Sequence, residues 1–301
     1  MQDWEDVRDQ CWAPATGVAY ESRWRKFFVF CKEYGLNPLP ASVATMCLYV
    51  TYLMKTLCYV TITNYISSVW VLHDYHGVEH IDCETYIFKA TMRGAKRILG
   101  NATRQVDPLS PQDMVAIYRT LNMANWLDIQ FWCALCICYR CLLRVSHVAL
   151  SPHTLRVKDI EFWRGGMDVV VKSSKTIQYR ERVQRVPVIE SPGSILCPVL
   201  RLRQYISNSG LSKESYLFPY TYNLFSTKLH KACTKAGLKG DYATHSLRRG
   251  SATFLASFLP LHEVRQYGDW KSWAVLLYIS DNYVSRMSKD VEVARRWSDF
   301  Y

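Results

Sequence analysis

The chain has 301 residues, of which 49% are hydrophobic and 21% are charged, a balance that excludes an intrinsically disordered protein. This length suits two domains, each with its own core. The formal net charge is +11, and the whole excess follows residue 103, because residues 1–103 hold 10 basic and 10 acidic residues and the remainder holds 27 and 16. The second part therefore has the charge expected of a surface that contacts a polyanion such as the DNA backbone.

The first hundred residues predict four helices. Apolar residues recur at helical spacing over residues 20–34, 41–57, 61–75 and 85–99. Turn signals separate the segments: prolines follow the first, Thr61 or Thr63 can cap the third, and Gly77 can end it. We therefore expect a compact helical domain over residues 1–103.

The second part, residues 104–301, predicts helices around a small sheet. Ser110, Pro111 and Asp113 have the pattern of a helix start. The expected helices are 126–143, 199–207, 222–236, 246–258, 261–267 and 274–281, and the expected strands are 157–163, 167–172 and 182–189. The fold class is therefore mainly α with a small antiparallel β-sheet, in two domains.

The 11 cysteines lie mostly in apolar helical runs, and no signal peptide precedes them, so we expect a reducing, intracellular compartment. Cys133, Cys136, Cys138 and Cys141 have two interpretations, a metal site or core packing. Their spacing spreads the thiols around one helix, which favours core packing and no metal. No apolar stretch approaches the roughly 20 residues of a membrane span, so no membrane partner is expected.

The most informative string is Ala-Thr-His-Ser-Leu-Arg-Arg-Gly-Ser-Ala-Thr at 243–253. His245 and Arg248 lie three residues apart at a predicted helix start, where they share a face and the free backbone N–H groups favour an anion such as phosphate. Trp270 follows in Gly-Asp-Trp-Lys-Ser, and Tyr278 stands eight residues later in an apolar run. A phenol in such a run has either a functional role or a buried partner.

In order and spacing, these segments resemble the tyrosine recombinases of phage integrase type. That family's signature is an arginine, a hairpin lysine, His-x-x-Arg, a His or Trp, and a tyrosine. Arg144, in Leu-Leu-Arg-Val-Ser-His, matches the first arginine, and Lys175, in Ser-Ser-Lys-Thr, matches the lysine. The resemblance covers nearly the whole chain. It implies a helical core-binding (SAM-like) DNA-binding domain, 1–103, and a catalytic domain, 104–301.

The resemblance implies a role for each residue in phosphoryl transfer. Arg144 and Arg248 would hold the scissile phosphate and stabilise charge on its oxygens. His245 would donate to the phosphate or accept the phenol proton, and Trp270 would donate its indole N–H. Tyr278 would attack phosphorus and form a 3′-phosphotyrosyl link. This chemistry requires no metal or nucleotide cofactor.

By the same resemblance, Lys175 would be the general acid that protonates the departing 5′-oxygen. The expected partner is double-stranded DNA, held in a C-shaped clamp by a homodimer or homotetramer. The segment 291–297 can dock on a neighbouring protomer or pack on its own domain. The expected location is intracellular, and nuclear if the source is a eukaryote.

The chain also departs from the family pattern. Phage and bacterial members usually place the tyrosine nine residues after the His or Trp, so Tyr283 stays an alternative nucleophile. His147 stands where the family usually has an acid, and an imidazole cannot orient neighbouring cations as a carboxylate does. A weakened or inactive DNA-binding relative is therefore an alternative, as is DNA relaxation of the type IB topoisomerase kind. The local sequences around Lys175 and Trp270 most resemble those of recombinases from eukaryotic mobile elements of the DIRS or Crypton type.

Each residue of the constellation has a structural alternative. Arg144 can be a helix C-cap, and Lys175 can be a solvated loop lysine, with Lys172 as the second candidate for the acid. His245 can be a cap or a core histidine, and the two aromatic residues can be core residues. Their joint order favours the catalytic interpretation.

Basic residues outside the constellation are candidates for contacts to DNA phosphates, which position a protein without specifying sequence. They can equally be ordinary helix surface charges or, near the lysine turn, a solvated strand edge. The candidates are Arg23, Arg25, Lys26, Lys89, Arg93, Lys96, Arg97, Lys172, Arg180, Arg182, Arg249 and Lys271.

Overall fold

The computed structural model of the protein describes residues 10–79, 82–102, 105–179 and 181–279. Contacts along the chain divide it into two compact units, Met1–Arg104 and Gln105–Tyr301, a boundary one residue from the one expected from the charge distribution. Each unit has a hydrophobic core of its own.

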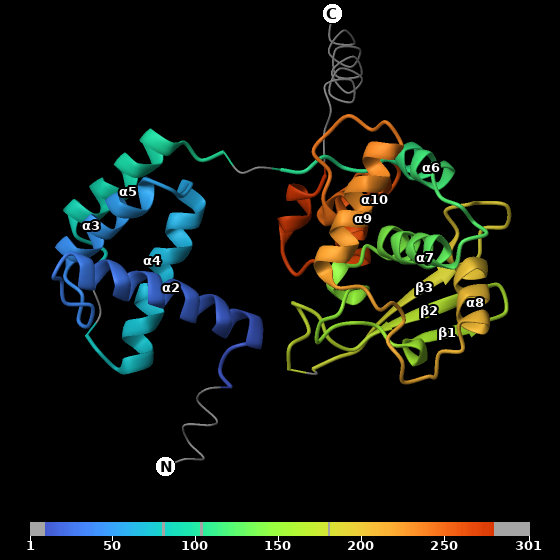
Figure 1. The fold of residues 1–301 in the computed structure, drawn as a ribbon, viewed down its shortest axis with the longest axis horizontal. Coiled ribbons are helices and arrows are strands. Elements are labelled where there is room, and N and C mark those ends of the chain that lie inside the picture. The colour runs from blue at the N-terminus through green and yellow to red at the C-terminus, as the bar shows by residue number, and fades with distance from the viewer. Residues whose placement is uncertain (1–9, 80–81, 103–104, 180, 280–301) are drawn as a thin grey trace, which may run out of the picture. The chain divides into compact units, whose positions relative to one another are not determined.

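Unit 1 is a helical bundle (Figure 1). Its helices are α2 (Pro14–Glu33), α3 (Val43–Met54), α4 (Tyr59–His76) and α5 (Tyr86–Leu99). Helix α2 packs on α4, and α3 packs on α5, around the fully buried Phe27, Met46 and Tyr49. The cap predicted for the third helix was wrong: α4 begins after Cys58, whereas Gly77 ends it in the left-handed region as expected, with φ of 63°.

Unit 2 is mainly helical and contains a three-stranded antiparallel sheet, which confirms the predicted fold class (Figure 1). Its helices are α6 (Pro111–Arg119), α7 (Trp126–Arg140), α8 (Pro198–Ser209), α9 (Tyr222–Lys235), α10 (Thr244–Leu255) and α11 (Leu261–Tyr267). Its strands are β1 (Ile160–Trp163), β2 (Gly166–Val171) and β3 (Gln184–Ile189), and its 3₁₀ helices are η1 (Val145–His147), η2 (Val157–Asp159) and η3 (Trp273–Leu277).

Helix α7 is the central element of unit 2, and it packs against α8 and α10. Its cysteines are at most 2% exposed, and burial raises the pKa of Cys133 and of Cys141 to about 12, so these thiols stay protonated in the core. Among the described residues, no three His, Cys, Asp or Glu side chains are grouped so that they could hold a metal ion.

The start of unit 2 is anchored as the sequence predicts. The Ser110 hydroxyl accepts from the Asp113 N–H at 3.1 Å, and the Asp113 carboxylate accepts from the Ser110 N–H at 2.8 Å. This capping box opens α6, with Pro111 at its first position. The N–H of Leu109 donates to the carbonyl of Ser246, which fixes the entering chain against α10.

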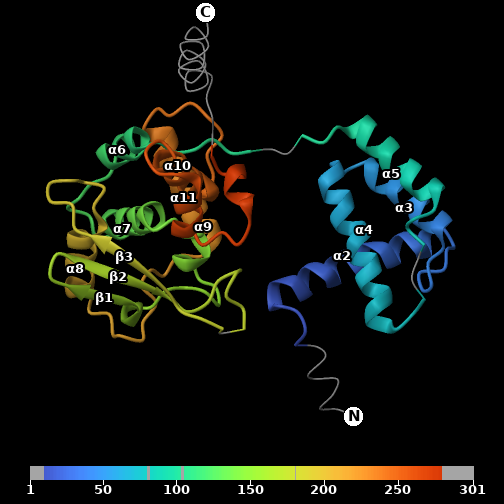
Figure 2. The same ribbon diagram turned by 180° about the vertical axis from the view of Figure 1, so that it is seen from behind.

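The sheet has the order β1-β2-β3, and Figure 2 shows the three strands side by side. The ladder between β2 and β3 ends at the pair Val171 and Gln184. Beyond it the chain continues as a long excursion whose tip is a two-residue turn between Ser174 and Ile177, and these two residues exchange backbone hydrogen bonds of 3.1 Å. The excursion carries Lys175 away from the sheet.

Two predicted elements differ from the structure. Residues 157–159 form η2 rather than the start of a strand, because the Asp159 carboxylate accepts from the N–H of Arg156 at 2.8 Å and turns the backbone. The helix expected at 274–281 is a short 3₁₀ helix, η3, and Tyr278 is the residue that ends it. Across the part of the chain that is described, no helix is both long enough and apolar enough to cross a membrane.

Candidate active site

Arg248 joins three segments of unit 2 that are distant in sequence. It lies in the first turns of α10 and is 3% exposed. Its Nη1 donates to the carbonyl of Leu142, just after α7, and its Nη2 donates to the carbonyl of Gly268 at 2.6 Å. Leu142 has a backbone φ of 47°, which residues other than glycine rarely adopt. This backbone conformation turns its carbonyl group toward Arg248.

Two aromatic rings lie against the Arg248 side chain, and a third ring lies next to one of them. Its guanidinium carbon lies 4.0 Å from the centroid of the Trp270 ring and 5.5 Å from that of Tyr278. The Trp270 and Tyr278 rings are 5.1 Å apart, and the His245 and Tyr278 rings are 6.2 Å apart. The structure therefore brings together four of the residues that the sequence singled out.

A cavity of about 260 Å³ opens beside these residues, at the N-terminus of α10. Its walls include Arg144, Thr244, His245 and Arg248. His245 is open to solvent on one side. Protein packed on its other side, followed by the charges of Arg248, Arg144 and Lys175, lowers the pKa of His245. The imidazole is therefore neutral at neutral pH, and cations from three different segments act on it.

Two buried donors at this site have no hydrogen-bond partner among the described residues: Nε1 of Trp270 and Nε of Arg248. An unpartnered buried N–H group is costly, so it is expected to have a ligand or to be held for one. Burial and the nearby charge of Arg144 lower the pKa of Arg248 to about 10, which still leaves the guanidinium cationic at neutral pH. A small anion such as a phosphodiester fits this set of donors.

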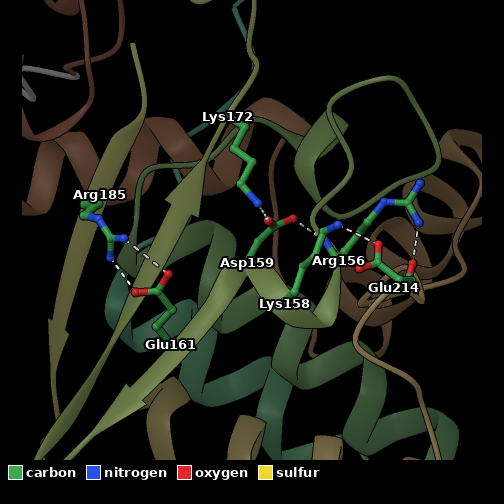
Figure 3. A network of polar contacts seen from close by, with 7 residues as sticks. All are labelled: Arg156, Lys158, Asp159, Glu161, Lys172, Arg185 and Glu214. Atoms are coloured by element: carbon green, nitrogen blue, oxygen red, sulfur yellow. Dashed lines mark hydrogen bonds and ion pairs between the residues drawn. The ribbon is translucent and has the colours of Figure 1, made fainter. Parts of the chain in front are cut away.

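Lys175 and Lys172 were both candidates for the general acid, and their surroundings differ. Lys172 Nζ lies 2.6 Å from Asp159, a carboxylate that is almost fully buried, within a network of ion pairs over the sheet (Figure 3). Lys175 is exposed at the tip of the turn, and its ammonium group makes no ion pair or hydrogen bond within the described part of the chain. Lys175 is therefore free to reach a substrate, and its charge already acts on His245.

The lysine turn is fastened to the loop that carries Trp270 by Asp269, a residue to which the sequence analysis gave no role. Arg182 Nη2 donates to both carboxylate oxygens of Asp269 at 2.7 Å, and the hydroxyl of Thr176 donates to one of them at 2.9 Å. Asp269 has a φ of 54°. The sequence showed only that Asp269 is an acid next to Trp270. Nothing in the sequence indicated that its partners would be Thr176 and Arg182.

Gly268 permits this loop to close. A Cβ atom placed on it would lie 1.7 Å from the Trp270 ring, which is far inside contact distance. Its φ of −90° is open to any residue, so the glycine is required by the ring and not by the backbone.

His147, at the position of the family acid, is 3% exposed. Its Nδ1 lies 3.0 Å from the carbonyl of Arg144, which can only accept, so Nδ1 carries the proton and Nε2 is an acceptor. Nε2 has no partner among the described residues. Burial lowers the pKa of His147 to about 4, and the positive charges of Arg144 and His153 act in the same direction. His147 is therefore a neutral acceptor, not a charge.

The backbone around Tyr278 is held from α10. Arg249 is 8% exposed, and its Nη1 donates to the carbonyl of Leu277 at 2.6 Å, while the hydroxyl of Thr253 lies 3.4 Å from the carbonyl of Tyr278. Arg249 therefore acts inside the fold, at the segment that presents the phenol. The alternative nucleophile, Tyr283, and the segment 291–297 lie outside the described residues.

The other candidates for DNA contact lie in varied surroundings. Arg182 and Lys172 are engaged by carboxylates, Lys271 is exposed with Nζ 4.0 Å from Glu181, and Arg180 lies outside the described residues. In unit 1 the basic residues of α5 are exposed, and most follow the i, i+4, i+7 spacing of one helix face. These are Lys89, Arg93, Lys96 and Arg97.

On α2 of unit 1, Arg23 and Lys26 both lie over the Tyr65 ring of α4, at 5.9 and 5.3 Å, and Arg25 is exposed. The cations of α2 and α5 thus stay at the surface, where phosphates can reach them.

Comparison with known proteins agrees with this geometry. A profile of the phage integrase family matches residues 108–283. An integrase/recombinase XerD homologue of Selenomonas ruminantium is 22% identical over 258 residues, covering 81% of this chain and 74% of that protein.

Two solved structures share the fold. The Tn1549 transposon integrase in complex with transposon right end DNA has 14% identity and a TM-score of 0.67, covering 96% of this chain and 97% of that one. A lambda integrase dimer bound to a COC′ core site has 16% identity and a TM-score of 0.59, covering 94% and 96%. Because the family profile spans more than half of the chain, the protein belongs to the phage integrase family and is a tyrosine recombinase.

Proposed function

We propose that the protein is a site-specific DNA recombinase that cuts and rejoins DNA through a covalent 3′-phosphotyrosyl intermediate on Tyr278. The observation that carries this proposal is the Arg248 guanidinium, which has the Trp270 and Tyr278 rings within 5.5 Å and borders the same cavity as His245 and Arg144. A scissile phosphate in that cavity would meet both arginines and His245.

In the proposed step, the Tyr278 oxygen attacks phosphorus and the bond from phosphorus to the 5′-oxygen breaks. The phenol proton passes to His245, which suits a general base because its lowered pKa leaves it neutral at neutral pH. Lys175 gives a proton to the departing 5′-oxygen. The phosphodiester is conserved as a phosphotyrosyl ester, so a 5′-hydroxyl of a partner strand can reverse the step and complete the exchange.

His147 is compatible with this activity. Its neutral Nε2 offers an acceptor where the family has a carboxylate, and the absence of positive charge at neutral pH means that it does not repel the neighbouring arginines. We therefore place the protein among active recombinases rather than silent DNA-binding relatives.

We further propose that the substrate is double-stranded DNA and that unit 1 is the core-binding domain, with the basic faces of α2 and α5 on phosphates. Lambda integrase, which is similar to this chain, was solved as a dimer on a core site and as a tetramer bound to a Holliday junction, so we propose that this protein also acts as a dimer or tetramer on DNA. The Tn1549 transposon integrase was solved in complex with transposon right end DNA, which supports a role in moving a genetic element. We also propose that the protein is related to the recombinases of DIRS-type or Crypton-type elements, and that it is nuclear if its source is a eukaryote.

A covalent-adduct assay tests the proposal. The full-length protein is incubated with nicked suicide duplexes of randomised core sequence, and adducts are isolated under denaturing conditions. We expect a DNA-linked protein whose modified peptide carries the nucleotide on Tyr278. Tyr278→Phe abolishes the adduct, and Tyr283→Phe retains it. An adduct that persists in Tyr278→Phe, or none in the unmodified protein, would refute the assignment.

A further inference from the structure

The loop between α11 and η3 and the turn that carries Lys175 are joined through one carboxylate, that of Asp269. Arg182 binds both of its oxygens and Thr176 binds one, each within 2.9 Å. Thr176 directly follows Lys175 in the two-residue turn, and its hydroxyl also lies 2.9 Å from that of Ser174. The contact therefore reaches the turn at the residue next to the lysine.

The other end of the same loop enters the phosphate site. Gly268, immediately before Asp269, accepts from Arg248 at 2.6 Å, and Trp270, immediately after it, stacks on that guanidinium at 4.0 Å. Asp269 is held in the left-handed region between them. One short loop thus fixes the lysine turn, the central arginine and the indole relative to one another.

Asp269 also brings a negative charge to the wall of the site where the family's acid is missing. A small cavity is lined by Arg144, His147, Ser174, Arg248 and Asp269 among others, and Asp269 is the one acid among the described residues that line it. His147, on the same cavity, is neutral. Among the described residues that line this cavity, the negative charge therefore comes from the loop and not from the 144–147 segment.

We propose that Asp269 is a positioning residue for Lys175: through Thr176 and Arg182 it holds the lysine turn beside the scissile phosphate, and it supplies the carboxylate that position 147 lacks. This inference rests on the proposed function, in which Lys175 protonates the 5′-oxygen. We call the contacts of Asp269 with Thr176 and Arg182 the Asp269 anchor. Without this anchor, the turn would keep only the contacts of Ser173 at its base, to His153 and to the carbonyl of Pro152, and the exposed lysine would lose its fixed position.

Asp269→Asn is the sharpest variant, because asparagine has the same shape and tolerates positive φ, while it removes the charge that Arg182 binds. Cleavage of a suicide duplex is measured at single turnover with two substrates, one with the ordinary 5′-oxygen and one with sulfur in its place. The sulfur leaving group needs no proton, because a thiol ordinarily ionises at a pH of about 8.5.

We expect Asp269→Asn to slow cleavage of the oxygen substrate by roughly 10²-fold, the lower part of the range that general acid catalysis contributes. On the sulfur substrate it should cleave at close to the unmodified protein's rate. Lys175→Ala sets the reference for loss of the acid and should show the same rescue, whereas Arg248→Ala should be slow on both substrates.

Glu214→Gln is the matched control, since it also turns an ion-paired carboxylate into an amide: Glu214 lies 2.6 Å from Lys158 (Figure 3) and lines neither cavity of the site. It should leave both rates unchanged. Thr176→Val is the second variant, because it removes the hydroxyl that donates to Asp269 and leaves the Trp270 loop unchanged. It should show the same rescue by sulfur, and it tests the inference if Asp269→Asn does not fold.

The inference is overturned if Asp269→Asn and Thr176→Val cleave both substrates at normal rates. It is also overturned if these variants are equally slow on both substrates, since the loop would then act through Arg248 or Trp270. The proposed function fails in a different way: the unmodified protein forms no adduct, or Lys175→Ala is not rescued by sulfur.

Discussion

Arg248 is the residue on which the candidate site depends most. Two backbone carbonyls, of Leu142 and Gly268, accept hydrogen bonds from its guanidinium, which lies over the Trp270 ring. A lysine has the charge but neither the planar fork nor the stacking surface, so it cannot serve both carbonyls in the same geometry. The site's conformation and its charge therefore come from the same side chain.

Arg248→Lys should accordingly reduce stability as well as cleavage. Leaving a buried carbonyl unsatisfied costs about 1–3 kcal/mol, and we expect a loss of this size in the free energy of unfolding measured with urea. Arg185→Lys is the control, because Arg185 is exposed in a surface ion pair with Glu161 and its replacement should leave the free energy of unfolding essentially unchanged. Equal losses in the two variants would contradict the central role of Arg248.

His147 gives the protein a stability that depends on pH. Its pKa is about 4 in the folded protein and about 6.5 in an unfolded chain, so the unfolded state binds the proton first as the pH falls. The stabilisation is complete above pH 6.5 and is lost progressively toward pH 4. Between pH 7 and 4.5 this amounts to about 2–3 kcal/mol.

His147→Gln removes the titrating group, so its free energy of unfolding should fall by about 2–3 kcal/mol less than that of the unmodified protein over the same pH range. Urea denaturation at several pH values measures the difference, and it cancels the contribution of the acidic residues common to both proteins. Parallel curves would show that His147 does not titrate in this window.

At the scale of secondary-structure elements, the sequence predicted what short-range patterns determine. The Ser110 capping box, the Gly77 helix end and the start of α7 follow from local hydrogen bonding and helical periodicity, and the structure confirms them. The strand at 157–159 and the helix at 274–281 were wrong, because contacts from Asp159 and from α10 override the local pattern there.

The candidate site shows the same limit. Six of its residues were identified from their order along the chain, and ring contacts connect four of them in the structure. Asp269 was not identified, because its partners Thr176 and Arg182 lie 93 and 87 residues away and no periodicity connects them. The positive φ of Leu142, which turns a carbonyl toward Arg248, likewise has no signal in a leucine.

The Gly268 loop allows a test at this scale. Gly268→Ala places a Cβ atom 1.7 Å from the Trp270 ring and must displace it, which we expect to cost about 1–3 kcal/mol and to slow cleavage more than tenfold. The backbone conformation is open to alanine, so the ring alone should cause the effect. Combining Gly268→Ala with Trp270→His, a smaller ring, should give a double variant little worse than Trp270→His alone. Additive losses would place the cause elsewhere in the loop.

At the scale of the whole molecule, the two units differ in how their charged residues are distributed. The acidic and basic residues of 1–103 balance, yet on α5 the bases gather on one exposed face, with Lys89 engaging Glu84 at its start. Unit 2 has the whole excess of positive charge, and it contains the site that we propose holds a phosphate. A balanced unit can therefore still present a basic surface, which is what counts for contact with a DNA backbone.

Replacing the four cations of α5, Lys89, Arg93, Lys96 and Arg97, by glutamine tests whether this face lies on DNA. Each phosphate contact contributes about 0.9 to the slope of log affinity against log salt, so the slope should become shallower by up to about 3–4. Since these side chains are exposed, the free energy of unfolding should change by less than about 1 kcal/mol. Replacing Lys158 and Lys213 of unit 2 in the same way provides the control for lost charge alone. Binding titrations of one duplex at several salt concentrations measure both slopes, and equal slopes for the two variants would exclude α5 from the DNA-contacting surface.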